Sequence, residues 1–249
     1  MFLVQNIRLD NGEFTKPEHG SLLEDDDRCR AALRIVKTIF PAGARGRSIV
    51  DLGCLEGGYS VAFARLGMDT VGLEVRKSNF ENCLYVKKNV DLPNLTFVND
   101  DAWNVSKYGK FDVVFCCGLL YHLDRPVAFI KELAGVCTKA LILNTHIATE
   151  RQSPYSLSNL TENEGIRGRW YREYDPGTNE ETLEGMKEAS WANPRSFWPL
   201  KEHVPQLLKD AGFDLVFEQF DHVGDNIFAE FTKGVSATHG RVQFLAIKS

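Results

Sequence analysis

Acidic and glycine residues gather just after the short apolar run at Ile49 and Val50. Asp51 ends this run, and Gly53, Glu56 and a Gly-Gly pair at 57–58 follow it. Glycine adopts backbone conformations that other residues avoid, and it lets a ligand approach the main chain. A helix starting here would offer free N–H groups to a carboxylate or a phosphate. The stretch therefore predicts a ligand-binding turn at the end of a strand.

The spacing of this turn restricts the class of ligand. A dinucleotide-binding turn has the pattern GxGxxG, whereas residues 53–58 read GCLEGG. Asp51 and Glu56 would also repel a pyrophosphate. Acids near the turn favour a ligand that carries positive charge, and the helix N–H groups would hold its carboxylate.

Two histidines follow later apolar runs. His122 lies in GLLYHLDRP, residues 118–126, and His146 follows ALILNT, residues 140–145. Histidine titrates near neutral pH, so His122 is a candidate general base for a hydroxyl or amine nucleophile; the alternative is a hydrogen bond to a carbonyl. Tyr121 and His146 are further candidate catalytic residues, expected in the same pocket. No third ligand is spaced to complete a metal site with the two histidines, and no metal is predicted.

The segments that must position these residues alternate between strand and helix. Alternation of this kind predicts an α/β fold with a doubly wound, mostly parallel, seven-stranded sheet, closed by an antiparallel C-terminal hairpin. No convincing helix is expected between Phe220 and Arg241. The expected strands are 48–52, 71–74, 95–98, 111–117, 140–145, 214–220 and 241–248, and the expected helices are 58–67, 76–90, 126–138 and 200–212.

Two segments do not fit this alternation. Residues 1–46 precede the first core strand and are predicted to form an N-terminal cap region with a helix at 24–39, followed by the main domain at 47–249. Residues 149–199 are rich in aromatic residues and are predicted to be an inserted substrate lid. Their RGRWYREY stretch makes Arg169 and Trp170 candidate acceptor-binding residues. The alternative is that these aromatics pack the insertion's own small core and that the arginines are solvated.

DLGCLEGG, residues 51–58, resembles the first motif of the class I S-adenosylmethionine-dependent methyltransferases, although Leu55 stands where the commonest motif has glycine. FDVVFCCGLLYHLDRP, residues 111–126, resembles the family's fourth motif. The likeness implies a Rossmann-like fold, Glu74 on the cofactor's ribose hydroxyls, and adenine contacts after the third strand. Asp101 could equally cap a short helix. The cofactor-binding residues that it implies are Asp51, Gly53, Cys54, Glu56, Gly57, Glu74, Asp101, Ala102 and Gly118.

The expected function is methyl transfer from S-adenosylmethionine to an oxygen or nitrogen of a small-molecule acceptor. GLLYHLDRP and PLKEHVPQLLKDAGF, residues 199–213, are also similar to the tRNA wobble-uridine carboxymethyltransferases. Three alternatives stay open: a tRNA-modifying methyl or carboxymethyl transferase, a non-catalytic partner subunit or sensor that binds the cofactor, and an NAD-dependent oxidoreductase.

Composition limits the partners and the compartment. The 249 residues carry a formal net charge of −5, which argues against a broad nucleic-acid footprint but leaves room for a local basic groove. The six cysteines show no CxxC spacing and are expected to be buried, reduced thiols in a cytoplasmic protein. The first residues show no secretory signal, and no apolar run has transmembrane length. The oligomeric state is not predicted.

Overall fold

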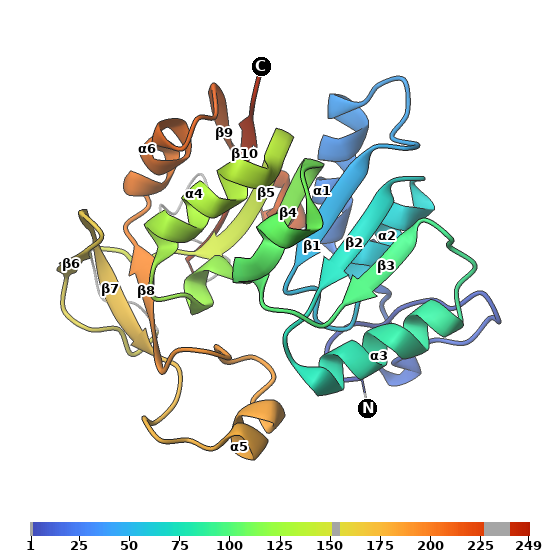
Figure 1. Cartoon of the computed structure of the whole chain (residues 1–249), viewed down its shortest axis with the longest axis horizontal. Coiled ribbons are helices and arrows are strands. Elements are labelled where there is room, and N and C mark those ends of the chain that lie inside the picture. The colour runs from blue at the N-terminus through green and yellow to red at the C-terminus, as the bar shows by residue number, and fades with distance from the viewer. Residues whose placement is uncertain (1, 151–154, 227–239) are drawn as a thin grey trace.

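A computed structural model of the chain describes residues 2–150, 155–226 and 240–249. Its main sheet has seven strands in the order β3-β2-β1-β4-β5-β10-β9, and β10 is antiparallel to both of its neighbours (Figure 1). The prediction of a doubly wound, mostly parallel sheet with an antiparallel C-terminal hairpin is confirmed. The strands are β1 (Ser48–Leu52), β2 (Asp69–Leu73), β3 (Leu95–Val98), β4 (Phe111–Cys117), β5 (Cys137–His146), β9 (Leu215–Gln219) and β10 (Arg241–Ile247).

Alternation of side chains along the central strands builds one core on each face of the sheet. Val50 and Val114 pack on one face with α4 (Pro126–Val136) and α6 (His203–Asp210). Ile49 and Val113 pack on the other with α1 (Asp27–Ile39) and α2 (Gly58–Arg65). α3 (Lys77–Lys88) packs beside α2 over β3. Because the central strands are buried on both faces, their carboxyl ends form the open edge where a ligand can bind.

The N-terminal region is joined to the ligand-binding turn by hydrogen bonds. The backbone N–H groups of Leu3, Val4 and Gln5 donate to the Glu56 carboxylate, at nitrogen–oxygen distances of 2.6, 3.1 and 2.8 Å. The Gln5 side chain accepts from the Gly58 N–H at the start of α2 (2.8 Å). The N-terminal segment therefore contributes directly to the shape of the turn. The domain division at residues 46 and 47 stays a prediction.

The inserted segment forms a small three-stranded antiparallel sheet beside the main one (Figure 1). Its elements are β6 (Thr161–Asn163), β7 (Ile166–Arg172), α5 (Glu180–Gly185) and β8 (Arg195–Pro199). β7 pairs with β8 in antiparallel register, from Gly168 opposite Pro199 to Arg172 opposite Arg195. A Cβ at Gly168 would lie 2.3 Å from the Trp198 carbonyl oxygen, so this close pairing requires glycine.

The remaining described elements are short. They are the 3₁₀ helices Pro17–His19, Leu23–Asp25, Ala102–Tyr108, Leu120–His122 and Asp221–Asn226. The expectation of no convincing helix between Phe220 and Arg241 falls largely on residues 227–239, which lie outside the described residues. All six cysteines are free thiols, and Cys117 is the least buried of them. Within the described ranges, every helix is too short or too polar to cross a membrane.

Candidate functional site

A cavity of about 820 Å³ lies at the carboxyl ends of the central strands. This volume is within the range of small-molecule and cofactor sites. Most of the residues selected from the sequence line it. These are Asp51, Gly53, Glu74, Asp101, Ala102, Gly118, Tyr121, His122 and His146.

Asp51 contributes a buried carboxyl group to the lining of this cavity. The Ser60 hydroxyl donates to its Oδ2 at 2.7 Å. Burial, together with the negative charge of Glu74, raises the pKa of Asp51 to about 7. In the adjoining turn Leu55 has a φ of 57°, the left-handed conformation that the family's commonest motif assigns to glycine. Leu55 therefore keeps the glycine-like path of the turn at some cost in backbone strain.

Glu74 lies beside Asp51 in the cavity wall. Its Oε2 accepts from the Leu55 N–H (2.9 Å), and its Oε1 accepts from the Arg76 N–H (2.9 Å). Burial raises the pKa of Glu74 despite these hydrogen bonds. The Asn79 side-chain amide also donates to Oε1, at 3.4 Å. Oε2 has a single donor and keeps a second lone pair, with which the carboxylate can still accept from a hydroxyl group of a ligand.

Asp101 caps a short helix and also lines the cavity. Its Oδ1 accepts from the Trp103 N–H at 2.9 Å and so caps the 3₁₀ helix Ala102–Tyr108. Asp101 and Ala102 also line the cavity. Gly118 lines it at the end of β4, with a φ of 80°.

Glu56, Gly57 and Cys54 do not line the cavity. The Glu56 carboxylate binds the N-terminal segment, as described above. A Cβ at Gly57 would lie 2.5 Å from the Phe97 ring, so glycine is required there by protein packing. Cys54 is 2% exposed, with its sulfur 3.8 Å from that of Cys83. The structure thus gives each of these three residues a contact within the protein.

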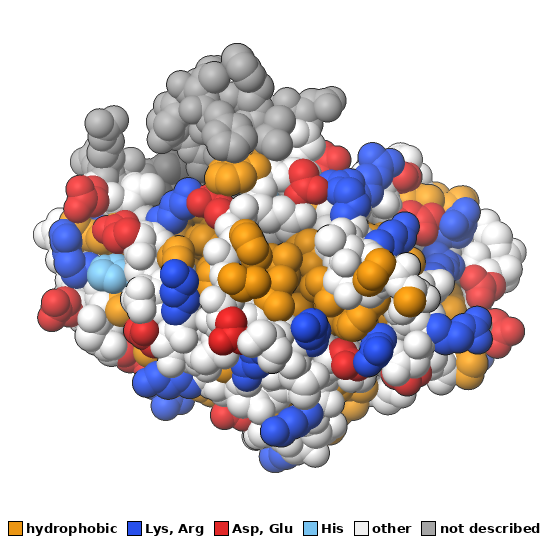
Figure 2. Space-filling view, turned by 90° about the horizontal axis from the view of Figure 1, so that it is seen from above, with side chains coloured by type: hydrophobic (Ala, Val, Ile, Leu, Met, Phe, Trp, Pro, Cys, Tyr) orange, Lys and Arg blue, Asp and Glu red, His pale blue; other side chains and the backbone are white. Residues whose placement is uncertain are grey.

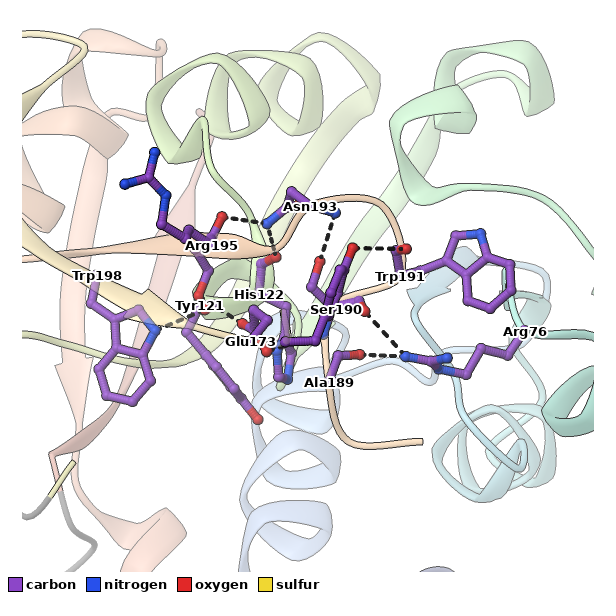
Figure 3. Close-up of polar contacts among 12 residues, drawn as sticks. Arg76, Tyr121, His122, Glu173, Ala189, Ser190, Trp191, Asn193, Arg195 and Trp198 are labelled. Atoms are coloured by element: carbon purple, nitrogen blue, oxygen red, sulfur yellow. Dashed lines mark hydrogen bonds and ion pairs between the residues drawn. The ribbon is translucent and has the colours of Figure 1, made fainter. Parts of the chain in front are cut away.

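His122 makes the most specific polar contact in the cavity. Its Nδ1 lies 3.0 Å from Oε1 of Glu173, and the Glu173 side chain is only 1% exposed. Glu173 also accepts from the Ser196 hydroxyl (2.6 Å) and from the Ser190 N–H (3.1 Å). Asn193 donates to the His122 carbonyl at 3.0 Å. Figure 3 shows this group, in which Glu173 and Asn193, the partners of the His122 side chain and carbonyl, come from the insertion.

Aromatic side chains surround the other end of the cavity. The rings of His146 and Trp198 are stacked, with centroids 4.9 Å apart, and Tyr171 stacks on Trp198 at 5.2 Å. Arg241 donates to the Tyr121 hydroxyl at 2.6 Å. The cavity wall also includes Tyr155. The tyrosine hydroxyls give this apolar end a few hydrogen-bonding groups, which is the usual composition of a small-molecule site.

Arg169 and Trp170 lie outside the cavity lining. The Arg169 guanidinium donates to the carbonyls of Thr149, Glu150 and Ser158 at 3.0, 3.0 and 2.7 Å. Trp170 packs edge-on against Phe197, and the Arg195 guanidinium covers its ring. Both residues have their contacts within the insertion. Trp170 packs there as the alternative expected, whereas Arg169 is hydrogen-bonded to the insertion's carbonyls and not simply solvated.

Arg76, which precedes α3, binds the insertion through hydrogen bonds. Its guanidinium donates to the carbonyls of Leu183, Ala189 (2.6 Å) and Ser190 (3.3 Å). The Trp191 ring lies against the guanidinium, 5.1 Å from its carbon (Figure 3). Residues 187–193 thereby line the cavity between Glu74 and His122.

Sequence reasoning missed Glu173, Tyr171, Trp198, Arg76 and Arg241. Glu173 and Tyr171 lie within the very stretch from which Arg169 and Trp170 were selected. Alternation along a strand separates Tyr171 from Trp170, but it does not say which face meets the cavity. No local signal links Arg76 or Arg241 to the site, because their partners are more than 100 residues away in the chain.

Comparison with known proteins agrees with the fold and with the predicted methyltransferase class. Residues 50–140 match a family described as "Methyltransferase domain". The chain is 31% identical to the ubiquinone biosynthesis O-methyltransferase of Psychrobacter arcticus over 129 residues, or 48% of this chain and 50% of that protein. It is 32% identical to the tRNA U34 carboxymethyltransferase of Campylobacter hominis over 94 residues, or 36% and 32%. The chain thus spans half or less of these curated relatives.

Solved structures show the same fold over nearly the whole chain. The N-terminal domain of EvdMO1 with SAH bound has a TM-score of 0.64 and 25% identity, covering 92% of this chain and 83% of that one. The 1,6-didemethyltoxoflavin-N1-methyltransferase of Burkholderia thailandensis has a TM-score of 0.58 and 12% identity, covering 94% and 84%. The prediction of a class I S-adenosylmethionine-dependent methyltransferase domain is confirmed.

Proposed function

We propose that this protein transfers a methyl group from S-adenosylmethionine to a hydroxyl group of a small, planar acceptor, with His122 as general base. The observation that carries the proposal is that one cavity holds both Asp51 and Glu74 at the strand ends and His122 on its carboxylate partner. The first pair suits the cofactor, and the histidine suits removal of a proton from the acceptor.

The chemistry of the cavity wall fits this cofactor. Burial raises the pKa values of both Asp51 and Glu74, so their carboxylates lie in a site that would gain from a positively charged ligand. Asp51 would face the cofactor's ammonium group, and Glu74 would accept from its ribose hydroxyls. Asp101 and Ala102 would lie against the adenine. The related domain of EvdMO1 was crystallised with SAH, which supports this choice.

The aromatic end of the cavity supports a small, planar acceptor. Tyr121, Tyr155 and Tyr171 line it, and Arg241 supplies a cation beside Tyr121. The resemblance to ubiquinone biosynthesis O-methyltransferases favours an oxygen nucleophile over nitrogen.

The protein's part in the reaction is to align the acceptor, exclude water and accept one proton. S-adenosylmethionine supplies a methyl group on a sulfonium, and the carbon–sulfur bond breaks to leave a neutral thioether. His122 would take the acceptor's hydroxyl proton on Nε2 as the new carbon–oxygen bond forms. Residues 187–193 would cover the site and keep water away from the reacting atoms.

A nucleic-acid acceptor has less support. On the part of the face in Figure 2 that described residues form, Lys and Arg side chains are interspersed with Asp and Glu. A nucleic-acid backbone requires a more continuous basic surface. The similarity to a tRNA U34 carboxymethyltransferase is nevertheless the reason to include RNA in the test.

Calorimetry with S-adenosylhomocysteine tests the cofactor half of the proposal. The Glu74→Gln variant should bind roughly 10-fold or more weakly, since a hydrogen bond to a charged group contributes about 1.5–3 kcal/mol. Glu81→Gln, on the exposed side of α3, is the matched control and should bind like the wild type. Equal affinity of the wild type and a folded Glu74→Gln variant would contradict the assignment.

Incubation with methyl-labelled cofactor tests the acceptor half. The protein is given a panel of phenols and catechols and, separately, bulk tRNA. Label should enter a phenolic hydroxyl, and His122→Ala should slow the transfer by roughly 10²–10⁴-fold while cofactor affinity stays the same. Label that enters tRNA alone would overturn the choice of acceptor, and full activity of His122→Ala would exclude the general base.

A further inference from the structure

We propose that Glu173 is the positioning residue for His122, and that docking of the insertion on Arg76 holds Glu173 in place. This inference rests on the proposed methyl transfer. It gives the insertion a second role besides covering the cavity: the insertion supplies the carboxylate that orients the His122 imidazole.

The surroundings of Glu173 determine how it holds the imidazole. Its side chain is 1% exposed and accepts from the Ser190 N–H and the Ser196 hydroxyl. An ionised carboxylate is only an acceptor, so the proton shared with His122 belongs to Nδ1 of the imidazole. The neutral ring then carries its lone pair on Nε2, which is the form that a general base requires. Within the described part of the chain, Nε2 makes no hydrogen bond.

Ser190 links this pair to the cofactor end of the cavity. Its N–H donates to Glu173, while its carbonyl accepts from Arg76. Arg76 in turn follows Glu74 by two residues, and its own N–H donates to the Glu74 carboxylate. Hydrogen bonds through Arg76 and Ser190 therefore connect Glu74, the proposed ribose-binding residue, to Glu173 and His122. Figure 3 shows the part of this path from Arg76 to His122.

Charge and proton balance support this assignment. When Nε2 takes the acceptor's proton, both ring nitrogens are protonated and the ring becomes a cation. The Glu173 carboxylate, 3.0 Å from Nδ1, compensates that charge within the closed site. The oxygen's electron pair forms the bond to the methyl carbon, and the sulfur keeps the pair of the broken bond.

The Glu173→Gln variant gives a test that requires no acceptor. The main-chain N–H of Ser190 must still face an oxygen, so the amide NH₂ of glutamine would point towards His122 and Ser196. Nδ1 would then have to accept, and the ring proton would move to Nε2. Long-range ¹H–¹⁵N spectra of the imidazole rings report which nitrogen carries the proton, and a His122→Gln variant assigns the signals.

The wild type should show His122 protonated on Nδ1, and Glu173→Gln should show it protonated on Nε2. Arg76→Lys should give a mixture, because one ammonium cannot hold the three carbonyls that the guanidinium holds. Glu181→Gln and Arg172→Lys, both exposed in the insertion, are the controls and should match the wild type.

Protonation of wild-type His122 on Nε2 would overturn the inference even if no variant folds, and so would an unchanged spectrum in Glu173→Gln. Cofactor affinity of the same samples keeps this outcome separate from failure of the proposed function. With an acceptor from the panel, Glu173→Gln should lower kcat by roughly 10²-fold or more and leave the KM for the cofactor unchanged.

Discussion

Packing within the protein accounts for glycine at position 57, whereas the sequence suggested the close approach of a ligand. Its φ of 86° lies in the left-handed region, and a Cβ there would come within 2.5 Å of Phe97. We expect Gly57→Ala to destabilise the protein by about 1–3 kcal/mol through backbone strain, with the clash adding to this. Chemical denaturation measures the loss.

Phe97→Leu in the Gly57→Ala background separates the two causes. The smaller side chain should relieve the clash and recover part of the stability, but not the part due to the positive φ. An alanine variant as stable as the wild type would mean that the turn follows another path.

We expect Asp51 to make cofactor affinity depend on pH. Its pKa of about 7 keeps the carboxyl largely neutral at pH 6, whereas pairing with the cofactor's ammonium requires the ionised form. Affinity should therefore rise about fivefold between pH 6 and pH 7, the increase in the ionised fraction. Calorimetry at the two values tests this, and Asp51→Asn should abolish the dependence. A wild type with pH-independent affinity would contradict the pairing.

The raised pKa of Asp51 also predicts how the stability of the unliganded protein changes with pH. Between the ordinary value of 3.8 and about 7, the folded state binds a proton that the unfolded chain releases. Stability should therefore fall as pH rises through this range, and Asp51→Asn should flatten the change.

At the scale of elements, strand β7 divides its residues between two tasks. Tyr171 lines the cavity, whereas Trp170 packs against Phe197 and Arg195. Tyr171→Leu should raise the KM for a phenolic acceptor with little change in stability. Trp170→Leu should instead lower the melting temperature and leave that KM nearly unchanged. The reverse result would mean that the other face of β7 meets the acceptor.

At the scale of the whole molecule, the N-terminal segment stabilises the methyltransferase sheet through one buried carboxylate. Glu56 is 1% exposed and accepts the N–H groups of residues 3–5. Deletion of residues 2–5 would leave this charge with few partners, and we expect a loss of roughly 3–5 kcal/mol. Denaturation of the full-length and shortened proteins measures it.

Glu56→Leu provides the control for this deletion. In the shortened chain the substitution should cost much less than in the full chain, because the charge no longer has its donors. Strictly additive losses would show that the segment and Glu56 stabilise the protein independently.

Sequence alone determined the sheet and which residues gather at the carboxyl ends of its strands. Apolar runs are long enough to identify each core strand, and the carboxyl ends of parallel strands meet at one edge, so Asp51, Glu74 and Asp101 had to lie together. The turn and cap residues at these strand ends interact with residues only a few positions away in the chain. A local sequence pattern is therefore enough to identify them. His122 follows β4 directly and was placed in the cavity for the same reason.

Tertiary structure alone decided what surrounds His122 and what covers the cavity. Glu173, Arg76 and Arg241 reach the site through contacts between distant segments, and no periodicity encodes such contacts. Glu56 and Gly57 match a ligand-binding pattern, yet their partners are the N-terminal segment and Phe97. A buried carboxylate can be paired with a ligand or with the protein's own N–H groups, and a glycine with a positive φ can make room for a ligand or for another side chain. Only the packing of distant segments determines which of the two applies.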